Sequence, residues 1–133
     1  MIRTALLAAA LLMPGHAAPA ETPLDAAGFE ARVTGKTMFY SSAGVPYGIE
    51  QYLPGRRVRW SFLGDECKDG IWYESDGLIC FEYEDGTGPQ CWQFFAETDG
   101  LRARFAGDAP GDDLYQTHET DEPMQCLGPR IGV

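Results

Sequence analysis

Residues 78–97, LICFEYEDGTGPQCWQFFAE, carry the clearest folding signal in the chain. Apolar residues recur on both sides of the Asp-Gly pair at 85–86, and such a pair between two strand-like segments is typical of a two-residue hairpin loop. In that hairpin Cys80 faces Cys91, and the apolar side chains share one face. A slip of one residue would lose both features. The segment therefore predicts an antiparallel hairpin with a Cys80–Cys91 disulfide.

Two further Asp-Gly pairs, at 76–77 and 99–100, predict hairpins of the same kind. Both registers place apolar side chains opposite each other on a single face, as a sheet with one buried side requires. The facing pairs are Trp72 with Phe81 for the first loop, and Phe94 with Phe105 and Ala96 with Ala103 for the second.

The Pro-Gly pair at 54–55 predicts a less regular hairpin. As a two-residue loop it places Ile49 opposite Trp60. It also places Glu50 opposite Arg59, as a cross-strand ion pair. Because L-Pro-Gly favours a type II turn, whose twist fits a tight hairpin poorly, a longer loop with a shifted register is the alternative.

Short apolar or alternating segments separated by turn residues follow one another after residue 35, and their regular spacing predicts an all-β antiparallel meander of seven or eight strands. An open meander of this length leaves two unpaired edges. We therefore expect a small, lipocalin-like up-and-down barrel, with a two-sheet sandwich as the alternative. The strands are expected near residues 36–41, 47–53, 56–63, 70–74, 78–84, 90–96, 101–106 and 113–118.

The first twenty residues have the pattern of a secretory signal peptide. Arg3 supplies the positive charge, and residues 5–13 form a continuous apolar run. Ala18 and Ala20 are the small residues before the expected cleavage site. The apolar run is too short to span a bilayer, which takes about 20 residues. A periplasmic or secreted protein without a membrane span is therefore expected.

One short helix is expected between the signal and the sheet, over residues 22–33. Asp25 can cap its N-terminus, and Gly35 is a natural stop. Phe29 and Val33 lie four residues apart, on one helix face. The expected segments are the signal over 1–20, the helical segment over 21–35, the β domain over 36–118 and an extended C-terminal strap over 119–133.

All four cysteines follow the signal, and an even number of cysteines in a small exported chain is typical of disulfides. Pairing Cys80 with Cys91 leaves Cys67 with Cys126, although four cysteines allow three connectivities. A zinc site is the alternative, but there is no C-x-x-C pair and His118 is the one histidine beyond the signal. No metal and no cofactor are expected.

The net charge of the chain limits the classes of partner that it is expected to bind. Without the signal, 9 basic and 20 acidic residues remain, a net charge of −11. Nucleic acids and anionic membranes are disfavoured as partners because both require basic patches. A small ligand or a cationic protein is the expected partner, and the chain is expected to be a monomer.

Four motifs stand out in the sequence of the expected β domain. They are YGIEQYLPGRRVRW at 47–60, CKDGIW at 67–72, ICF at 79–81 and QCW at 90–92. Together they resemble a family of small exported proteins of alphaproteobacteria that has no assigned activity. The resemblance covers about residues 36–131 and implies an exported, disulfide-bonded β domain, with no catalytic residues to carry over.

No catalytic residue is predicted. None of the serines beyond the signal lies in a G-x-S-x-G motif, and cysteines in disulfides cannot act as nucleophiles. Glu82 and Glu84 share the outward face of one strand and could divide acid and base roles, although a solvated surface is favoured. An acidic loop is likewise favoured over a calcium site at Asp108, Asp112 and Asp113.

Sixteen aromatic residues are spread over nearly every expected strand. A small barrel can be filled by such side chains, but those less readily assigned to the core could line a barrel mouth. The candidate ligand-binding residues are Tyr47, Tyr52, Arg57, Trp72 and Tyr73.

These observations predict a non-enzymatic exported β-barrel module that binds a small ligand or a protein. The alternative is a periplasmic enzyme inhibitor or accessory protein that acts through its acidic surface. A small carboxylate-dependent hydrolase is a weaker third interpretation.

Overall fold

The computed structural model describes residues 13–15, 21–63 and 65–126. Most of the predicted signal peptide and the last seven residues of the predicted C-terminal strap lie outside the described residues. Within the described part of the chain, no helix is long and apolar enough to cross a membrane.

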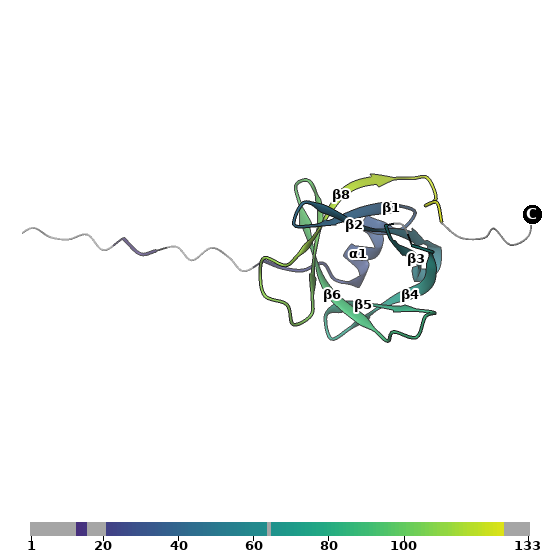
Figure 1. The fold of residues 1–133 in the computed structure, drawn as a ribbon. Coiled ribbons are helices and arrows are strands. Elements are labelled where there is room, and N and C mark those ends of the chain that lie inside the picture. Colours follow the sequence, from purple (N-terminus) through teal and green to yellow (C-terminus); the bar gives the residue numbers. More distant parts are fainter. Residues whose placement is uncertain (1–12, 16–20, 64, 127–133) are drawn as a thin grey trace, which may run out of the picture.

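Eight antiparallel strands follow a single short helix and form a closed barrel in which each strand pairs with the next and β8 pairs with β1 (Figure 1). The predicted barrel is therefore confirmed over the two-sheet sandwich. The elements are α1 (Ala26–Val33), β1 (Thr37–Ser42), β2 (Val45–Leu53), the 3-10 turn η1 (Pro54–Arg56), β3 (Arg57–Phe62), β4 (Lys68–Ser75), β5 (Leu78–Tyr83), β6 (Gln90–Glu97), β7 (Gly100–Phe105) and β8 (Leu114–Thr120).

Helix α1 begins later than the predicted residue 22, because its N-cap is Asp25. The Asp25 carboxylate accepts a hydrogen bond from the backbone N–H of Gly28 at 2.7 Å. The chain leaves the helix through Gly35, whose φ of 83° favours glycine. Phe29 and Val33, on one face of the helix, are fully buried.

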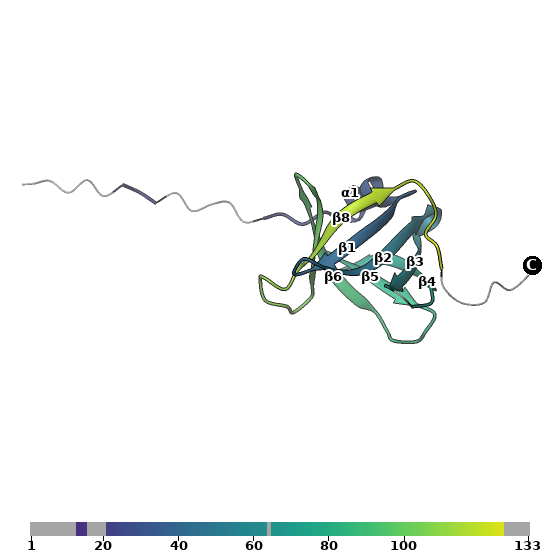
Figure 2. The ribbon, with the colours of Figure 1, turned by 45° about the horizontal axis from the view of Figure 1, so that its top comes forward.

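Helix α1 closes one end of the barrel. Figure 1 shows it within the ring of strands, and in Figure 2 it lies at the top of the barrel while the loop between β5 and β6 lies at the bottom. The Phe29 ring packs against aromatic rings from four strands, β2, β4, β5 and β6. Its ring centroid lies 5.7 Å from that of Tyr52, 5.0 Å from Trp72, 6.3 Å from Phe81 and 4.5 Å from Phe94.

The β5–β6 hairpin has the predicted register, with Cys80 opposite Cys91. Its loop is longer than two residues, because strand pairing ends at Phe81 and Gln90 and residues 84–89 form the connection. The predicted two-residue loop at 85–86 is therefore wrong, although the facing pairs are right. The 76–77 hairpin is confirmed, with Trp72 opposite Phe81.

The strand register of the β6–β7 hairpin differs from the predicted register by two residues. Phe94 faces Ala103 rather than Phe105, because the loop lies at 98–99 and Gly100 already belongs to β7. A shift of two residues preserves the alternation of faces. Leu101 and Ala103 consequently remain inside the barrel, as expected.

The strand register of the β2–β3 hairpin differs from the predicted register by one residue, and this changes which β2 side chains face inward. The three-residue turn η1 replaces the predicted loop at 54–55, so Glu50 faces Trp60. Gly48, Glu50 and Tyr52 are consequently buried. The predicted Glu50–Arg59 ion pair is wrong.

Both predicted disulfides are present. They join Cys80 to Cys91 and Cys67 to Cys126, and no described cysteine is free. The second bond attaches the segment after β8 to the start of β4 across a separation of 59 residues. Closing a loop of that length stabilises the fold by roughly 4 kcal/mol in the chain-entropy model.

A buried ion-pair network lies on the outer face of β7. The Asp113 carboxylate accepts hydrogen bonds at 2.8 Å from Arg102 Nη1 and at 2.8 Å from Arg104 Nε. Arg102 also binds Glu21 at 2.6 Å and Glu97 at 2.5 Å, which ties the segment before α1 to the barrel. Because Asp113 is 3 % exposed, removing it would leave its two arginines without their shared buried acceptor.

Asp113→Ala should lower the free energy of unfolding by about 3 kcal/mol at neutral pH, measured by urea denaturation. Asp112→Ala, in the same loop but exposed, is the matched control and should change it by less than about 0.5 kcal/mol. The two guanidinium groups lower the pKa of Asp113, so its contribution is present above the ordinary aspartate pKa and is lost as the pH falls through the lowered value. Equal effects of the two variants at neutral pH would contradict a stabilising role for the network.

Candidate functional site

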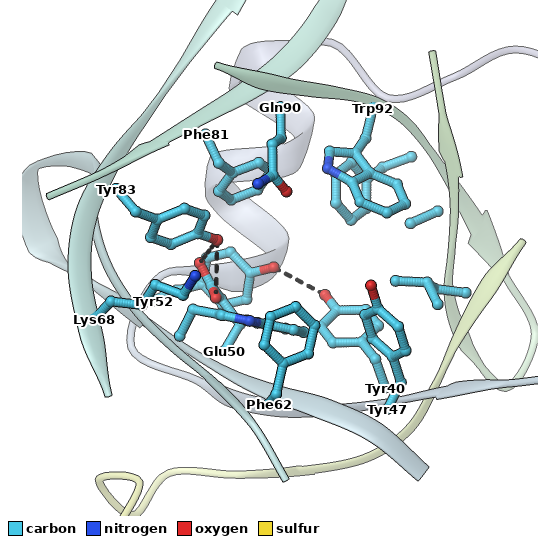
Figure 3. Close-up of a pocket in the computed structure, with 14 residues that line it drawn as sticks. Tyr40, Tyr47, Glu50, Tyr52, Phe62, Lys68, Phe81, Tyr83, Gln90 and Trp92 are labelled. Atoms are coloured by element: carbon cyan, nitrogen blue, oxygen red, sulfur yellow. Dashed lines mark hydrogen bonds between the residues drawn. The ribbon is translucent and has the colours of Figure 1, made fainter. Parts of the chain in front are cut away.

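The barrel interior contains a cavity at the end opposite α1. Connections in an up-and-down barrel alternate between its two ends, and the lining residues Tyr47, Phe62, Lys68 and Gln90 lie near the connections that are remote from the helix. The cavity has a volume of about 50 Å³, room for about two water molecules at ~30 Å³ each. Figure 3 shows it with the helix behind it.

Aromatic rings form most of the cavity wall. Nine of the fourteen lining residues are Phe, Tyr or Trp. The ring centroid of Tyr47 lies 5.9 Å from that of Trp60 and 5.4 Å from that of Phe62. Glycine at position 48 makes room for this wall, because a Cβ there would overlap the Trp60 ring. The non-aromatic lining residues are Glu50, Lys68, Gln90, Ala103 and Leu114.

Of the described residues that line the cavity, Glu50 is the one that is acidic, and it is 2 % exposed. The Tyr83 hydroxyl lies 3.1 Å and 3.2 Å from its two carboxylate oxygens and donates to them (Figure 3). Among the described residues, no Lys, Arg or His nitrogen lies within 4.0 Å of these oxygens. Burial raises the pKa of Glu50 well above its ordinary value, an effect that the Tyr83 hydrogen bond only partly offsets.

Two tyrosine hydroxyls meet beside Glu50. The oxygens of Tyr40 and Tyr52 lie 2.9 Å apart, and both side chains are buried (Figure 3). Burial raises the pKa of both phenols, so they remain neutral at physiological pH. The site therefore offers neutral hydroxyls and one carboxyl group within an aromatic enclosure.

Lys68 stands at the open rim of the cavity. Its ammonium lies 2.6 Å from the Asp85 carboxylate, and 5.4 Å and 5.7 Å from the ring centroids of Phe62 and Tyr83. The hydrogen bond from Lys68, together with bonds from Thr87, lowers the pKa of Asp85 to about 2. The charge of Lys68 is therefore paired with a carboxylate outside the cavity rather than with Glu50.

The five predicted ligand-binding residues do not lie together in the structure. Tyr47 and Tyr52 line the cavity. Trp72 is buried at the helix end of the barrel, against Phe29 and under the Arg56 guanidinium. Arg57 is exposed, and Tyr73 lies on the opposite face of β4 from Trp72.

Sequence reasoning missed Glu50, Lys68, Tyr83 and Gln90 as members of the site. The two-residue alternation that places Phe81 inside also places Tyr83 inside, and the same alternation runs from Trp72 to Lys68. Those two residues could have been identified in this way. The inward position of Glu50 depends on the turn at 54–56, whose length the Pro-Gly pair left open.

The other candidate catalytic and metal-binding groups lie outside the cavity. Glu82 is exposed, and the Asp113 carboxylate forms ion pairs with Arg102 and Arg104. The ring centroid of His118 lies 5.2 Å from that of Phe39, on β1. Within the described parts of the chain, no three His, Cys, Asp or Glu side chains are grouped so that they could hold a metal ion.

Comparison of the chain with protein-family models, with curated proteins and with solved structures gives no match. The geometry of the cavity is therefore the basis for any functional proposal.

Glu50→Gln should make the protein more stable than the wild type at high pH and leave it nearly unchanged at low pH. The raised pKa means that the wild type loses stability as the pH rises from the ordinary glutamate value through the raised one, whereas glutamine has no proton to lose. Urea denaturation should show nearly equal free energies of unfolding for the variant and the wild type at pH 4. At pH 9 the variant should be more stable by about 1–3 kcal/mol. Glu82→Gln, on the exposed face of β5, is the control and should show no such trend. A difference between Glu50→Gln and the wild type that does not change with pH would contradict the burial of an uncompensated carboxyl group.

Proposed function

We propose that this protein is an exported, non-enzymatic module that binds a small ligand in the cavity at the open end of its barrel. The observation that carries the proposal is the combination of nine aromatic lining residues with one buried carboxyl group. Apolar enclosures with a few convergent polar groups are the usual form of small-molecule sites.

The position of the cavity favours binding over a structural role. Around Phe29 the helix end of the barrel is filled by its own side chains, which accounts for the packing of the core. The open end carries buried polar groups that such packing does not need, since burying a carboxyl group costs free energy. The volume of about 50 Å³ suits a ligand, or part of a ligand, of only a few non-hydrogen atoms.

Two further features support a non-enzymatic, exported protein. All four cysteines are in disulfides, which form and persist in oxidising compartments outside the cytoplasm. The polar groups that face Glu50 are phenols whose pKa is raised by burial, and these are poor nucleophiles at neutral pH.

Ligand-observed NMR with a library of small fragments tests the proposal. Fragments of each charge type would be screened for binding, and hits would be followed through the amide and indole N–H signals of labelled protein. We expect fragments of at least one charge type to shift the indole N–H signals of Trp60 and Trp92, because both rings line the cavity.

Ala103→Leu provides the decisive comparison, since Ala103 is 2 % exposed and lines the cavity. The larger side chain should fill the space and abolish binding, at a folding cost of about 1–3 kcal/mol. Ala96→Leu makes the same change on an exposed part of β6 and should leave binding intact. If no fragment shifts the cavity signals, or if Ala103→Leu binds fragments as the wild type does, the cavity is not a ligand site.

A further inference from the structure

We propose that the ligand class of this cavity is the small organic cation, a substituted ammonium ion held by Glu50 and the surrounding aromatic rings. The proposal deepens the proposed function and rests on it. Three independent features of the open end support it: the carboxyl group, the rings and the charge of the rim.

The carboxyl group of Glu50 has no positively charged partner among the residues that the structure describes. An ionised carboxylate offers about four acceptor positions, and the single Tyr83 hydroxyl proton occupies only one of them at a time. A buried carboxylate becomes favourable when an opposite charge is close to it. An ammonium ion in the cavity would supply that charge, whereas an anionic ligand would add repulsion.

The rings at the rim already accept an ammonium group. Lys68 Nζ lies within 6 Å of the ring centroids of Phe62 and Tyr83, the range in which a cation is attracted to an aromatic face. Tyr47 and Trp60 add further aromatic walls that no cation of the described residues covers. The enclosure therefore has the composition of an aromatic cage for a substituted ammonium ion.

The loops around the opening carry only negative formal charge among their described residues. These loops span residues 43–44, 65–67, 84–89 and 106–112 and contain no Lys, Arg or His. Apart from Lys68, which is paired with Asp85, the described residues of the rim therefore carry charge of one sign, which focuses the potential into the opening and raises the local concentration of ions of opposite charge. Its exposed acidic residues are Asp65, Glu66, Glu84, Asp85, Asp108 and Asp112.

Tetramethylammonium and tert-butanol test the proposal directly, because they have nearly the same tetrahedral shape and differ in charge. Pivalate, which joins a tert-butyl group to a carboxylate, is the negatively charged probe. Affinities would be measured by NMR titration at pH 8, with ionic strength matched by sodium chloride. We expect tetramethylammonium to bind at least about tenfold more tightly than either of the other probes, a difference of about 1.4 kcal/mol. Its binding should disappear in Ala103→Leu.

Two substitutions should move the affinity in opposite directions. Glu50→Gln keeps the shape and the Tyr83 hydrogen bond but removes the charge, so the affinity for tetramethylammonium should fall at least about tenfold. Lys68→Gln removes the competing ammonium from the rim and should raise the affinity severalfold. Glu82→Gln, on the outside of β5, should change it less than about twofold.

A third readout is the pH dependence in the wild type. The ionisable side chains that line the cavity around Glu50 are Tyr40, Tyr47, Tyr52, Tyr83 and Lys68. Burial raises the pKa of Tyr40, Tyr52 and Tyr83 above their ordinary value, so a change of affinity at pH values above the ordinary glutamate pKa reports the ionisation of Glu50. Affinity should rise with pH in the wild type, as the Glu50 carboxyl group loses its proton, and stay constant in Glu50→Gln.

The outcomes separate this inference from the proposed function. If tert-butanol or pivalate binds as tightly as tetramethylammonium and Ala103→Leu abolishes that binding, the cavity is a ligand site but its class is not cationic. Equal affinity of the wild type and Glu50→Gln for tetramethylammonium would also overturn the inference. If neither these probes nor the fragment library shifts the cavity signals, both proposals fail.

Discussion

The register between β2 and β3 is the constraint on which the interior of this barrel depends. Side chains alternate between the two faces of a strand, so a shift of one residue exchanges every inward side chain of β2 for an outward one. The three-residue turn η1 sets that register and places Glu50 opposite Trp60. Arg56, the last residue of the turn, is held by Glu30 at 3.1 Å and stacks on Trp72, so contacts with α1 and β4 support this turn.

Helix α1 divides the barrel interior into two parts with different physical character. Around Phe29, aromatic rings from several strands pack edge to face and fill the space. Beyond them no helix formed by residues 21–63 or 65–126 fills the barrel, and the strands enclose polar groups among aromatic walls. One closed end and one open end follow from a single short helix in an eight-stranded barrel, because the helix can plug only one of the two.

Two buried carboxyl groups in the protein have opposite surroundings. Asp113 lies between two guanidinium groups, which lower its pKa and make it part of the structure that holds β7 and β8. In the described part of the chain the hydrogen-bond donor to Glu50 is a single phenol, and burial raises the pKa of Glu50. A carboxylate that is fully paired within the protein has little capacity left for a ligand. The unpaired one in a cavity is where binding chemistry is most readily placed.

Local signals in the sequence were sufficient for the eight strands, the cap at Asp25, both disulfides and the registers around Asp76-Gly77 and Cys80–Cys91. Turn residues constrain neighbours a few residues away, and the Cys67–Cys126 pair, 59 residues apart, follows by elimination once Cys80 faces Cys91. The face on which Glu50 lies, and the burial of Trp72 beneath Arg56 rather than in the cavity, were settled only in the folded molecule. Both depend on contacts of the turn at 54–56 with residues distant in the sequence, and no local pattern of residues encodes such contacts.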